Sequence, residues 1–175
     1  GIGVLYGKTD RLKAMRPFQG GGEMIAEVTM DTVTYNDPPH RFEAGTPPIL
    51  EAIGLGAAIA WMEGLDRDAA EAHEAALCDR AMTALGDLNW VRLHGRARDK
   101  GAIVAFSLEG AHPHDVAQIL DRQGVAIRAG HHCAQPLMQR LGVTATARAS
   151  FACYNTALEV DLFIEALHKA RKLLG

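Results

Sequence analysis

VAIRAGHHCAQPLMQRLGVTATARASF, residues 125–151, determines the fold of the second half of the chain. Its first residues, Val125–Arg128, and its last, Ala147–Phe151, have the composition and length of two short strands. The connection between them is rich in glycine and histidine and contains one cysteine, Cys133. The stretch therefore predicts two strands of a sheet and, between them, a loop in which chemically active side chains gather.

The sequence on both sides extends this sheet and adds helices. Upstream, the pattern predicts two strands and one helix, at residues 91–93, 102–106 and 113–123. Downstream, a final helix opens at Thr156 with Glu159 three residues later, which is a capping box. From about residue 90 the order is β-β-α-β-loop-β-α, which predicts an α/β domain with helices over a mostly antiparallel sheet.

The N-terminal part has a different pattern. We expect a strand, an exposed hairpin and two helices, at residues 2–6, 28–35, 47–62 and 67–85. The first of these helices is apolar nearly all round, which predicts burial on most sides, and Thr46 is its expected N-cap. We therefore divide the chain into residues 1–64, a linking helix over 65–89, and a small domain over 90–175.

Composition narrows the class of protein. The 175 residues are 48 % apolar and 22 % charged, which is typical of a globular chain. The formal net charge of −3 argues against a nucleic-acid partner. Three cysteines without a C-x-x-C pair argue against a disulfide framework and favour a reducing compartment. The longest apolar run, Ile49–Met62, is too short to span a bilayer, so we expect a cytoplasmic protein with no membrane contact.

Cys133 is the strongest candidate for chemistry. It lies beside His131 and His132 and near Arg128. Positive neighbours raise the thiolate fraction of a cysteine, and an exposed loop lets it reach a substrate, so the pattern favours a nucleophile. We expect no metal site, because the side chains of three consecutive residues diverge and would be poor ligands to one zinc ion.

Two further positions have open interpretations. Arg148 lies in a strand between small residues, and there it either pairs with a carboxylate of the protein or holds one from a ligand. Gly45 and Thr46 stand at a helix start, where backbone N–H groups and a hydroxyl can meet a phosphate, although most such turns are simple caps.

Together these motifs resemble a known family. RAGHHCAQPLM, ATARASFACYNT, FEAGTP, GGGEMI and GIGVLYGK occur in the order found in SUF-type (group II) cysteine desulfurases. These are pyridoxal-phosphate enzymes of the class V aminotransferase-like family, and the resemblance covers essentially the whole chain. It implies the C-terminal portion of the fold type I architecture: the end of the large domain followed by an α/β small domain.

The resemblance also implies roles. In the family, a cysteine attacks the sulfur of an L-cysteine held on the cofactor, alanine leaves, and the persulfide passes to a sulfur-acceptor protein for iron–sulfur cluster assembly. Cys133 matches that nucleophile, Arg148 the clamp on the substrate carboxylate, and Arg128 a residue that shapes the substrate site. Gly45 and Thr46 match the contact to the cofactor phosphate across a homodimer interface.

For His131 and His132 we expect only loop support and local electrostatics. The family's Schiff-base lysine follows a histidine just before the GIGVLY motif, and this chain begins at that motif. We therefore expect a segment that is inactive by itself. Two alternatives stay open: a selenocysteine lyase or other class V relative, and a non-catalytic module that relays sulfur or binds a partner.

Overall fold

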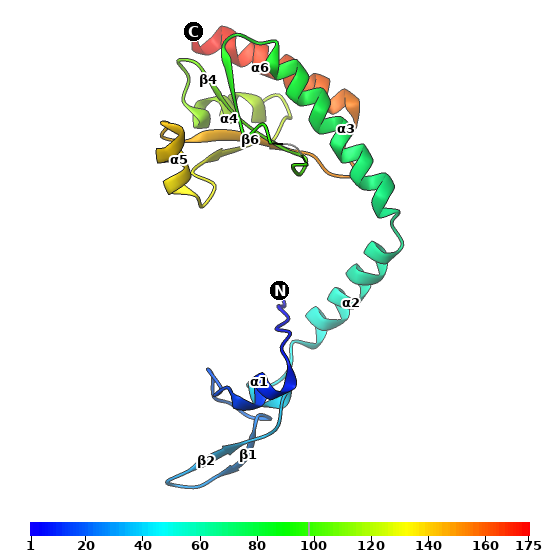
Figure 1. Ribbon diagram of the computed structural model, residues 1–175, viewed down its shortest axis with the longest axis vertical. Coiled ribbons are helices and arrows are strands. Elements are labelled where there is room, and N and C mark those ends of the chain that lie inside the picture. The colour runs from blue at the N-terminus through cyan, green and yellow to red at the C-terminus, as the bar shows by residue number, and fades with distance from the viewer. Residues whose placement is uncertain (98) are drawn as a thin grey trace. The chain divides into compact units, whose positions relative to one another are not determined.

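The computed structural model describes residues 1–97 and 99–175, and its contacts divide the chain into two units, Gly1–Leu65 and Asp66–Gly175. Figure 1 labels the α-helices and several of the strands of each unit. The first unit contains α1 (Thr9–Ala14), β1 (Ile25–Val28), β2 (Val33–Tyr35), the 3-10 helix η1 (His40–Phe42) and α2 (Ile49–Glu63). The second contains α3 (Arg67–Gly86), β3 (Val91–His94), β4 (Ile103–Leu108), α4 (Pro113–Asp121), β5 (Arg128–Gly130), α5 (Gln135–Leu141), β6 (Thr146–Ser150) and α6 (Ala157–Leu174).

The strands of the second unit form one sheet in the order β3-β4-β6-β5, and every neighbouring pair is antiparallel. Successive side chains of a strand point to opposite faces. Val104 and Phe106 of β4 therefore share one face, and both are fully buried. The other face carries Ala105 and, paired with it on β6, the half-buried Arg148. The antiparallel α/β domain predicted from the sequence is confirmed.

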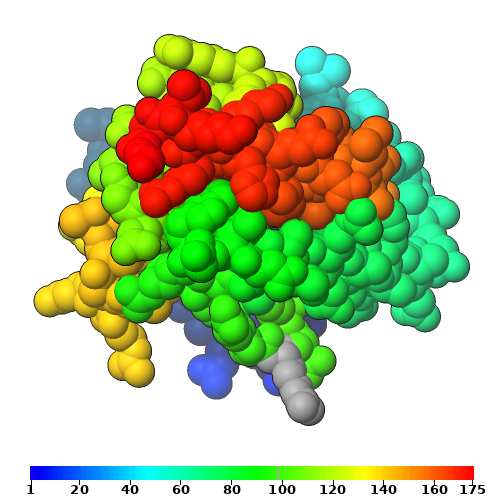
Figure 2. All heavy atoms as spheres, turned by 90° about the horizontal axis from the view of Figure 1, so that it is seen from above, coloured from blue at the N-terminus to red at the C-terminus, as the bar shows by residue number. Residues whose placement is uncertain are grey.

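Helices α3, α4 and α6 cover the buried face of this sheet. The ring of Phe106 meets that of Phe163 on α6 edge to face, with centroids 5.7 Å apart. Figure 2 shows α6 lying alongside α3. The two helices are joined by Arg80 and Asp161, whose side chains approach to 2.7 Å. The hydrophobic core thus lies on the opposite side of the sheet from Arg148.

Helix α3 belongs to this core, although we expected residues 65–89 to link two domains. One stripe of the helix is buried together with the sheet: Leu77, Cys78, Ala81 and Leu85. The helix begins at Asp66, whose carboxylate accepts a hydrogen bond from the Ala69 N–H at 3.0 Å. The two units therefore separate just before this cap.

The expected strand at residues 2–6 does not form within the described chain. These residues have no strand assignment, and Val4, Leu5 and Tyr6 are exposed. A strand needs a neighbour for its backbone N–H and C=O groups, and in this unit β1 pairs with β2 alone. The sequence prediction of a strand was wrong because apolar alternation does not by itself supply that neighbour.

Helix α2 also differs from expectation. Pro48 precedes its first residue, and no side chain caps it, so Thr46 is not the N-cap. None of its residues is buried within the described chain. Apart from the half-buried Leu55, its large apolar side chains are exposed: Ile49, Leu50, Ile53, Ile59, Trp61 and Met62. None of the described helices is both long and apolar enough to cross a lipid bilayer.

Two elements of the cysteine-containing stretch differ from the sequence prediction. The Val125 N–H bonds to the Leu120 carbonyl at 3.1 Å and closes the end of α4, so strand β5 starts only at Arg128. Residues 135–141 form the short helix α5 rather than loop. Pro136 in its first turn and Gly142 after its end, at φ +70°, are the sequence signals for this helix.

Candidate active site

Cys133 lies in a tight turn between β5 and α5. The turn is closed by the Ala134 N–H, which donates to the His131 carbonyl at 2.9 Å. Both central residues, His132 and Cys133, have positive φ, +56° and +58°. Two such residues without glycine are unusual, because left-handed backbone costs a residue with a Cβ roughly 1–2 kcal/mol. The turn therefore needs stabilising contacts from outside itself.

The side chain of His132 supplies such a contact. Its Nε2 lies 3.0 Å from the backbone carbonyl of Thr146 and 3.0 Å from the Thr146 hydroxyl. Thr146 is the first residue of β6 and is buried, and its hydroxyl lies 3.9 Å from the sulfur of Met138 on α5. Strand β6, helix α5 and the cysteine turn are joined through this one threonine.

These contacts define the protonation state of His132. A carbonyl oxygen only accepts hydrogen bonds, so Nε2 carries the proton and Nδ1 has a free lone pair. Burial lowers the pKa of His132 below its usual value, and the charges of Arg148 and Arg128 act in the same direction, while the bond to Thr146 opposes them. The ring is therefore neutral near pH 7, and its buried Nδ1 has no partner among the described residues.

Two arginines stand side by side on the same sheet face. Arg128 of β5 pairs directly with Arg148 of β6, so their side chains are neighbours. Neither forms an ion pair within residues 1–97 and 99–175, and the Nε of Arg148 is buried without a partner. Two like charges at opposed positions are destabilising unless an anion lies between them. Arg148 thus has no carboxylate partner within the described chain, so the first of its two interpretations does not hold there.

The thiol of Cys133 is the accessible one of the three. Its sulfur lies 3.9 Å from Nη2 of Arg128, and the residue is exposed. Cys78 is buried in α3, where burial raises its pKa and keeps it a neutral thiol. Cys153 is half-buried in the segment that follows β6. Exposure and a neighbouring guanidinium make Cys133 the cysteine best placed to act as a nucleophile.

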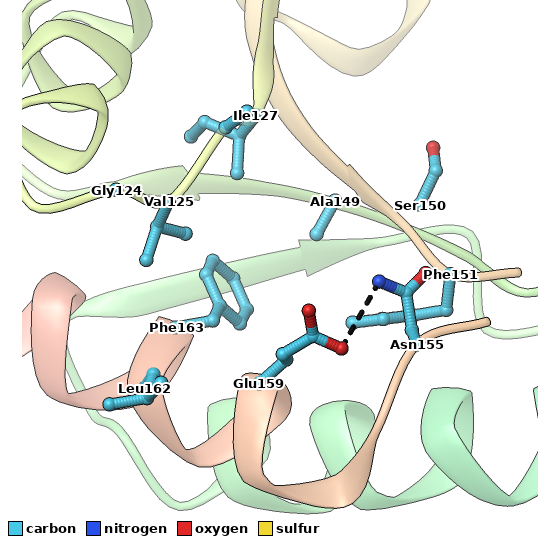
Figure 3. Close-up of a pocket in the computed structure, with 11 residues that line it drawn as sticks. Gly124, Val125, Ile127, Ala149, Ser150, Phe151, Asn155, Glu159, Leu162 and Phe163 are labelled. Carbon is cyan, nitrogen blue, oxygen red and sulfur yellow. Dashed lines mark hydrogen bonds between the residues drawn. The ribbon is translucent and has the colours of Figure 1, made fainter.

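A cavity of about 270 Å³ lies elsewhere in this unit (Figure 3). It is lined by the segment before β5, the end of β6 and the first turns of α6, including Ala149 and Phe163. Ala149 points to the opposite face of β6 from Arg148, so this cavity is separate from the cysteine turn. Its carboxylate, Glu159, is engaged in the helix cap and contacts Asn155 at 3.4 Å.

Gly45 and Thr46 lie in the first unit, in the loop before α2. Gly45 has φ +82°, which favours glycine, and its N–H donates to the Gly22 carbonyl at 2.9 Å. The Thr46 side chain is exposed. Within the described residues, no group of three or more His, Cys, Asp or Glu side chains is arranged to hold a metal ion.

The sequence pattern points to the cysteine, both arginines and both histidines of this region, but not to Thr146. His131 contributes its carbonyl to the turn, and its side chain is exposed. The alternation of β6 is the signal that could have pointed to Thr146, since it stands two residues before Arg148 and shares its face.

Comparison with known proteins places these features in a family. The model for "Aminotransferase class-V" matches residues 1–163. A probable cysteine desulfurase of Streptomyces coelicolor is 47 % identical over 177 residues, which cover all of this chain and 42 % of that protein.

Two solved structures are similar as well. The cysteine desulfurase CsdA of Escherichia coli superposes with a TM-score of 0.91 at 42 % identity, over 97 % of this chain and 42 % of that one. The cysteine desulfurase of Thermococcus onnurineus NA1 gives a TM-score of 0.88 at 39 % identity, also over 97 % and 42 % of the two chains. The chain therefore spans less than half the length of the relatives it matches.

Proposed function

The chain belongs to the class-V aminotransferase family, and from that membership we propose that it carries the nucleophile and the substrate-carboxylate site of a cysteine desulfurase. The reaction converts L-cysteine to L-alanine and leaves a persulfide on Cys133. The observation that carries the proposal is the exposed Cys133 in its turn beside two arginines that lack an internal carboxylate.

Arg148 binds the substrate carboxylate. Its fork of N–H donors matches a carboxylate in a bidentate geometry. Its Nε is buried without a partner, so this donor is free to bind the ligand. The neighbouring Arg128 adds a second positive charge on the same face. The neutral ring of His132 adds no third positive charge beside these two arginines.

Cys133 carries out the sulfur transfer. Its thiolate sulfur forms a bond to the substrate sulfur, the substrate C–S bond breaks, and the electron pair of that bond stays on carbon. The carbon takes up a proton, which balances the proton lost by the Cys133 thiol. One cysteine and one thiol thus become one alanine and one persulfide, and no external oxidant is needed.

Pyridoxal phosphate is the cofactor we propose, and it supplies the electron sink that C–S cleavage requires. Among the residues of this chain, Gly45 and Thr46 fit its phosphate, because the turn exposes a hydroxyl beside a glycine at positive φ. No lysine of the chain lies in the cysteine turn. The five lysines are at the start and end of α1, after β3 and on α6: Lys8, Lys13, Lys100, Lys169 and Lys172.

We further propose that the enzyme is a homodimer and delivers its persulfide to an acceptor protein of the SUF type, for iron–sulfur cluster assembly. The exposed apolar side chains of α2, such as Leu50 and Trp61, support the proposal that another protein surface packs against the first unit. The exposure of Cys133 supports access by an acceptor thiol. Light scattering on the full-length protein tests the dimer.

The test of the function uses the full-length gene product loaded with pyridoxal phosphate and given L-cysteine. We expect equal amounts of alanine and transferable sulfur, and we expect the peptide that contains Cys133 to gain the mass of one sulfur atom. Cys133→Ala should abolish both products. Cys153→Ser is the matched control, because Cys153 lies outside the turn, and it should retain the activity.

Two other results identify the alternatives. If Cys133→Ala still releases sulfur from cysteine at the wild-type rate, the protein is a related lyase that does not use this thiol. If the wild-type protein accepts a persulfide from a donor but forms no alanine, Cys133 relays sulfur without generating it.

A further inference from the structure

Two side-chain contacts connect the cysteine turn to the sheet: the hydrogen bonds of His132 to Thr146, and the 3.9 Å approach of Arg128 Nη2 to the Cys133 sulfur. His132 and Cys133 are consecutive residues with left-handed backbone, and no glycine relieves either of them. The nearest external support is the pair of contacts from Nε2 of His132 to the carbonyl and hydroxyl of Thr146, both 3.0 Å long. Loss of these contacts leaves the turn held by its own backbone hydrogen bond, by its covalent ends and by the long 3.9 Å contact between Arg128 and the Cys133 sulfur.

The supporting residue lies on the strand that also carries the substrate arginine. Thr146 and Arg148 are two positions apart on β6, so their side chains lie on the same face of the sheet. Their separation is therefore determined by the strand itself. A contact from the cysteine turn to Thr146 places the turn at a defined distance from whatever Arg148 binds.

We infer that His132 is a positioning residue: anchored on Thr146, it sets the distance between the Cys133 sulfur and a carboxylate bound at Arg148. The inference rests on the proposed function. Sulfur transfer requires the Cys133 sulfur to approach the substrate sulfur in line with the C–S bond that breaks. A small misplacement of the nucleophile therefore lowers the rate without weakening the binding of the carboxylate. His132 thus acts through geometry and does not itself exchange a proton with the substrate.

Two substitutions of His132 distinguish this anchoring role from a purely local role, in which only the tolerance of residue 132 for left-handed backbone matters. Asparagine tolerates left-handed backbone better than histidine, but its side chain is too short to reach Thr146. Glutamine gains nothing in backbone preference, but its amide nitrogen can occupy the position of Nε2 and donate to the same carbonyl. An anchoring role predicts that His132→Gln outperforms His132→Asn. A purely local role predicts the reverse.

Both variants are made in the full-length protein with pyridoxal phosphate bound, and steady-state kinetics are measured with L-cysteine. We expect His132→Asn to lower kcat by at least about tenfold, with KM unchanged within about twofold. His132→Gln should restore most of the lost kcat. His114→Asn, a change at an exposed histidine on α4, is the matched control and should behave as wild type.

A second readout does not depend on activity. The Ala134 amide closes the turn, so its hydrogen exchange reports how firmly the turn is held. We expect exchange in the peptide that contains Ala134 to be at least about tenfold faster in His132→Asn and near wild type in His132→Gln. Thr146→Val, which keeps the shape and removes the hydroxyl, should give an intermediate exchange rate.

Three results would overturn the inference. One is a His132→Asn enzyme with wild-type kcat, and another is an equal loss of kcat in the two His132 variants. The third is a change that falls on KM alone. If the wild-type protein forms no alanine, the proposed function fails instead, and the exchange rates alone then decide whether His132 anchors the turn.

Discussion

Arg148 differs from an ordinary surface arginine in two respects. Its Nε is buried without a hydrogen-bond partner, and the residue opposite it on β5 is Arg128, another cation. Buried polar groups in native proteins are nearly always paired, and like charges are seldom left opposed. Both features are explained if a ligand carboxylate completes the site.

We therefore predict that Arg148→Gln raises KM for L-cysteine by about 10- to 100-fold, the usual value of hydrogen bonds to a charged group. Glutamine keeps part of the size of the side chain and removes its charge. Arg140→Gln, at an exposed arginine on the last turn of α5, serves as the control. Steady-state kinetics on the holoenzyme measure both. An equal KM for the two variants would show that Arg148 does not hold the substrate.

The start of α6 shows what a single element contributes. Thr156 and Glu159 form a complete capping box: the Thr156 hydroxyl accepts from the Glu159 N–H at 3.3 Å, and the Glu159 carboxylate accepts from the Thr156 N–H at 2.6 Å. The bond from the Thr156 backbone, together with that from Asn155, lowers the pKa of Glu159. The sequence predicted this cap because both members lie within four consecutive residues.

This cap predicts a pH-dependent stability. A carboxyl whose pKa is lower in the folded state stabilises the fold above its unfolded pKa of about 4.3, and that contribution disappears as the pH falls through the folded value. Glu159→Gln should therefore be less stable than wild type at pH 7, and the difference should shrink in acid below the unfolded pKa. Urea unfolding of wild type and Glu159→Gln, at pH 7 and at a pH below the unfolded pKa, measures this difference in stability. A difference that does not depend on pH would contradict the ionic part of the cap.

At the scale of the whole molecule, the two units differ in how much they bury. Met24 is the one buried apolar side chain of the first unit among the described residues. The core cluster, with Phe106 and Phe163 in contact, lies entirely within residues 66–175. Hydrophobic burial is the main favourable contribution to folding, so stability is concentrated in the second unit.

We predict that residues 66–175 expressed alone unfold in one cooperative thermal transition, followed by circular dichroism. Residues 1–65 alone should show no such transition, because the exposed apolar side chains of α2 have nothing to pack against in that unit. A cooperative transition in the shorter piece would mean that its α2 surface forms a core of its own, for example by self-association. Concentration dependence of the transition separates these two cases.

Local sequence patterns predicted most elements of the second unit. The capping box, the alternation of the strands and the apolar stripe of α6 each involve neighbours in sequence, so they can be read without coordinates. Patterns failed where the outcome depended on distant partners. The apolar residues 2–6 form no strand because no neighbouring strand is present in the described unit. Strand β5 starts later than predicted because Val125 bonds back to Leu120.

By itself, the sequence determined the α/β class and the family, and it predicted Cys133 as the nucleophile, since all three inferences depend on residue types in a fixed order. Only the tertiary structure decided which side chains meet. It brought Arg128 opposite Arg148 through the register of β5 and β6, and it placed Thr146 within hydrogen-bond distance of His132. The reason is physical: the geometry of a site depends on strand pairing and turn conformation, which join residues far apart in the chain.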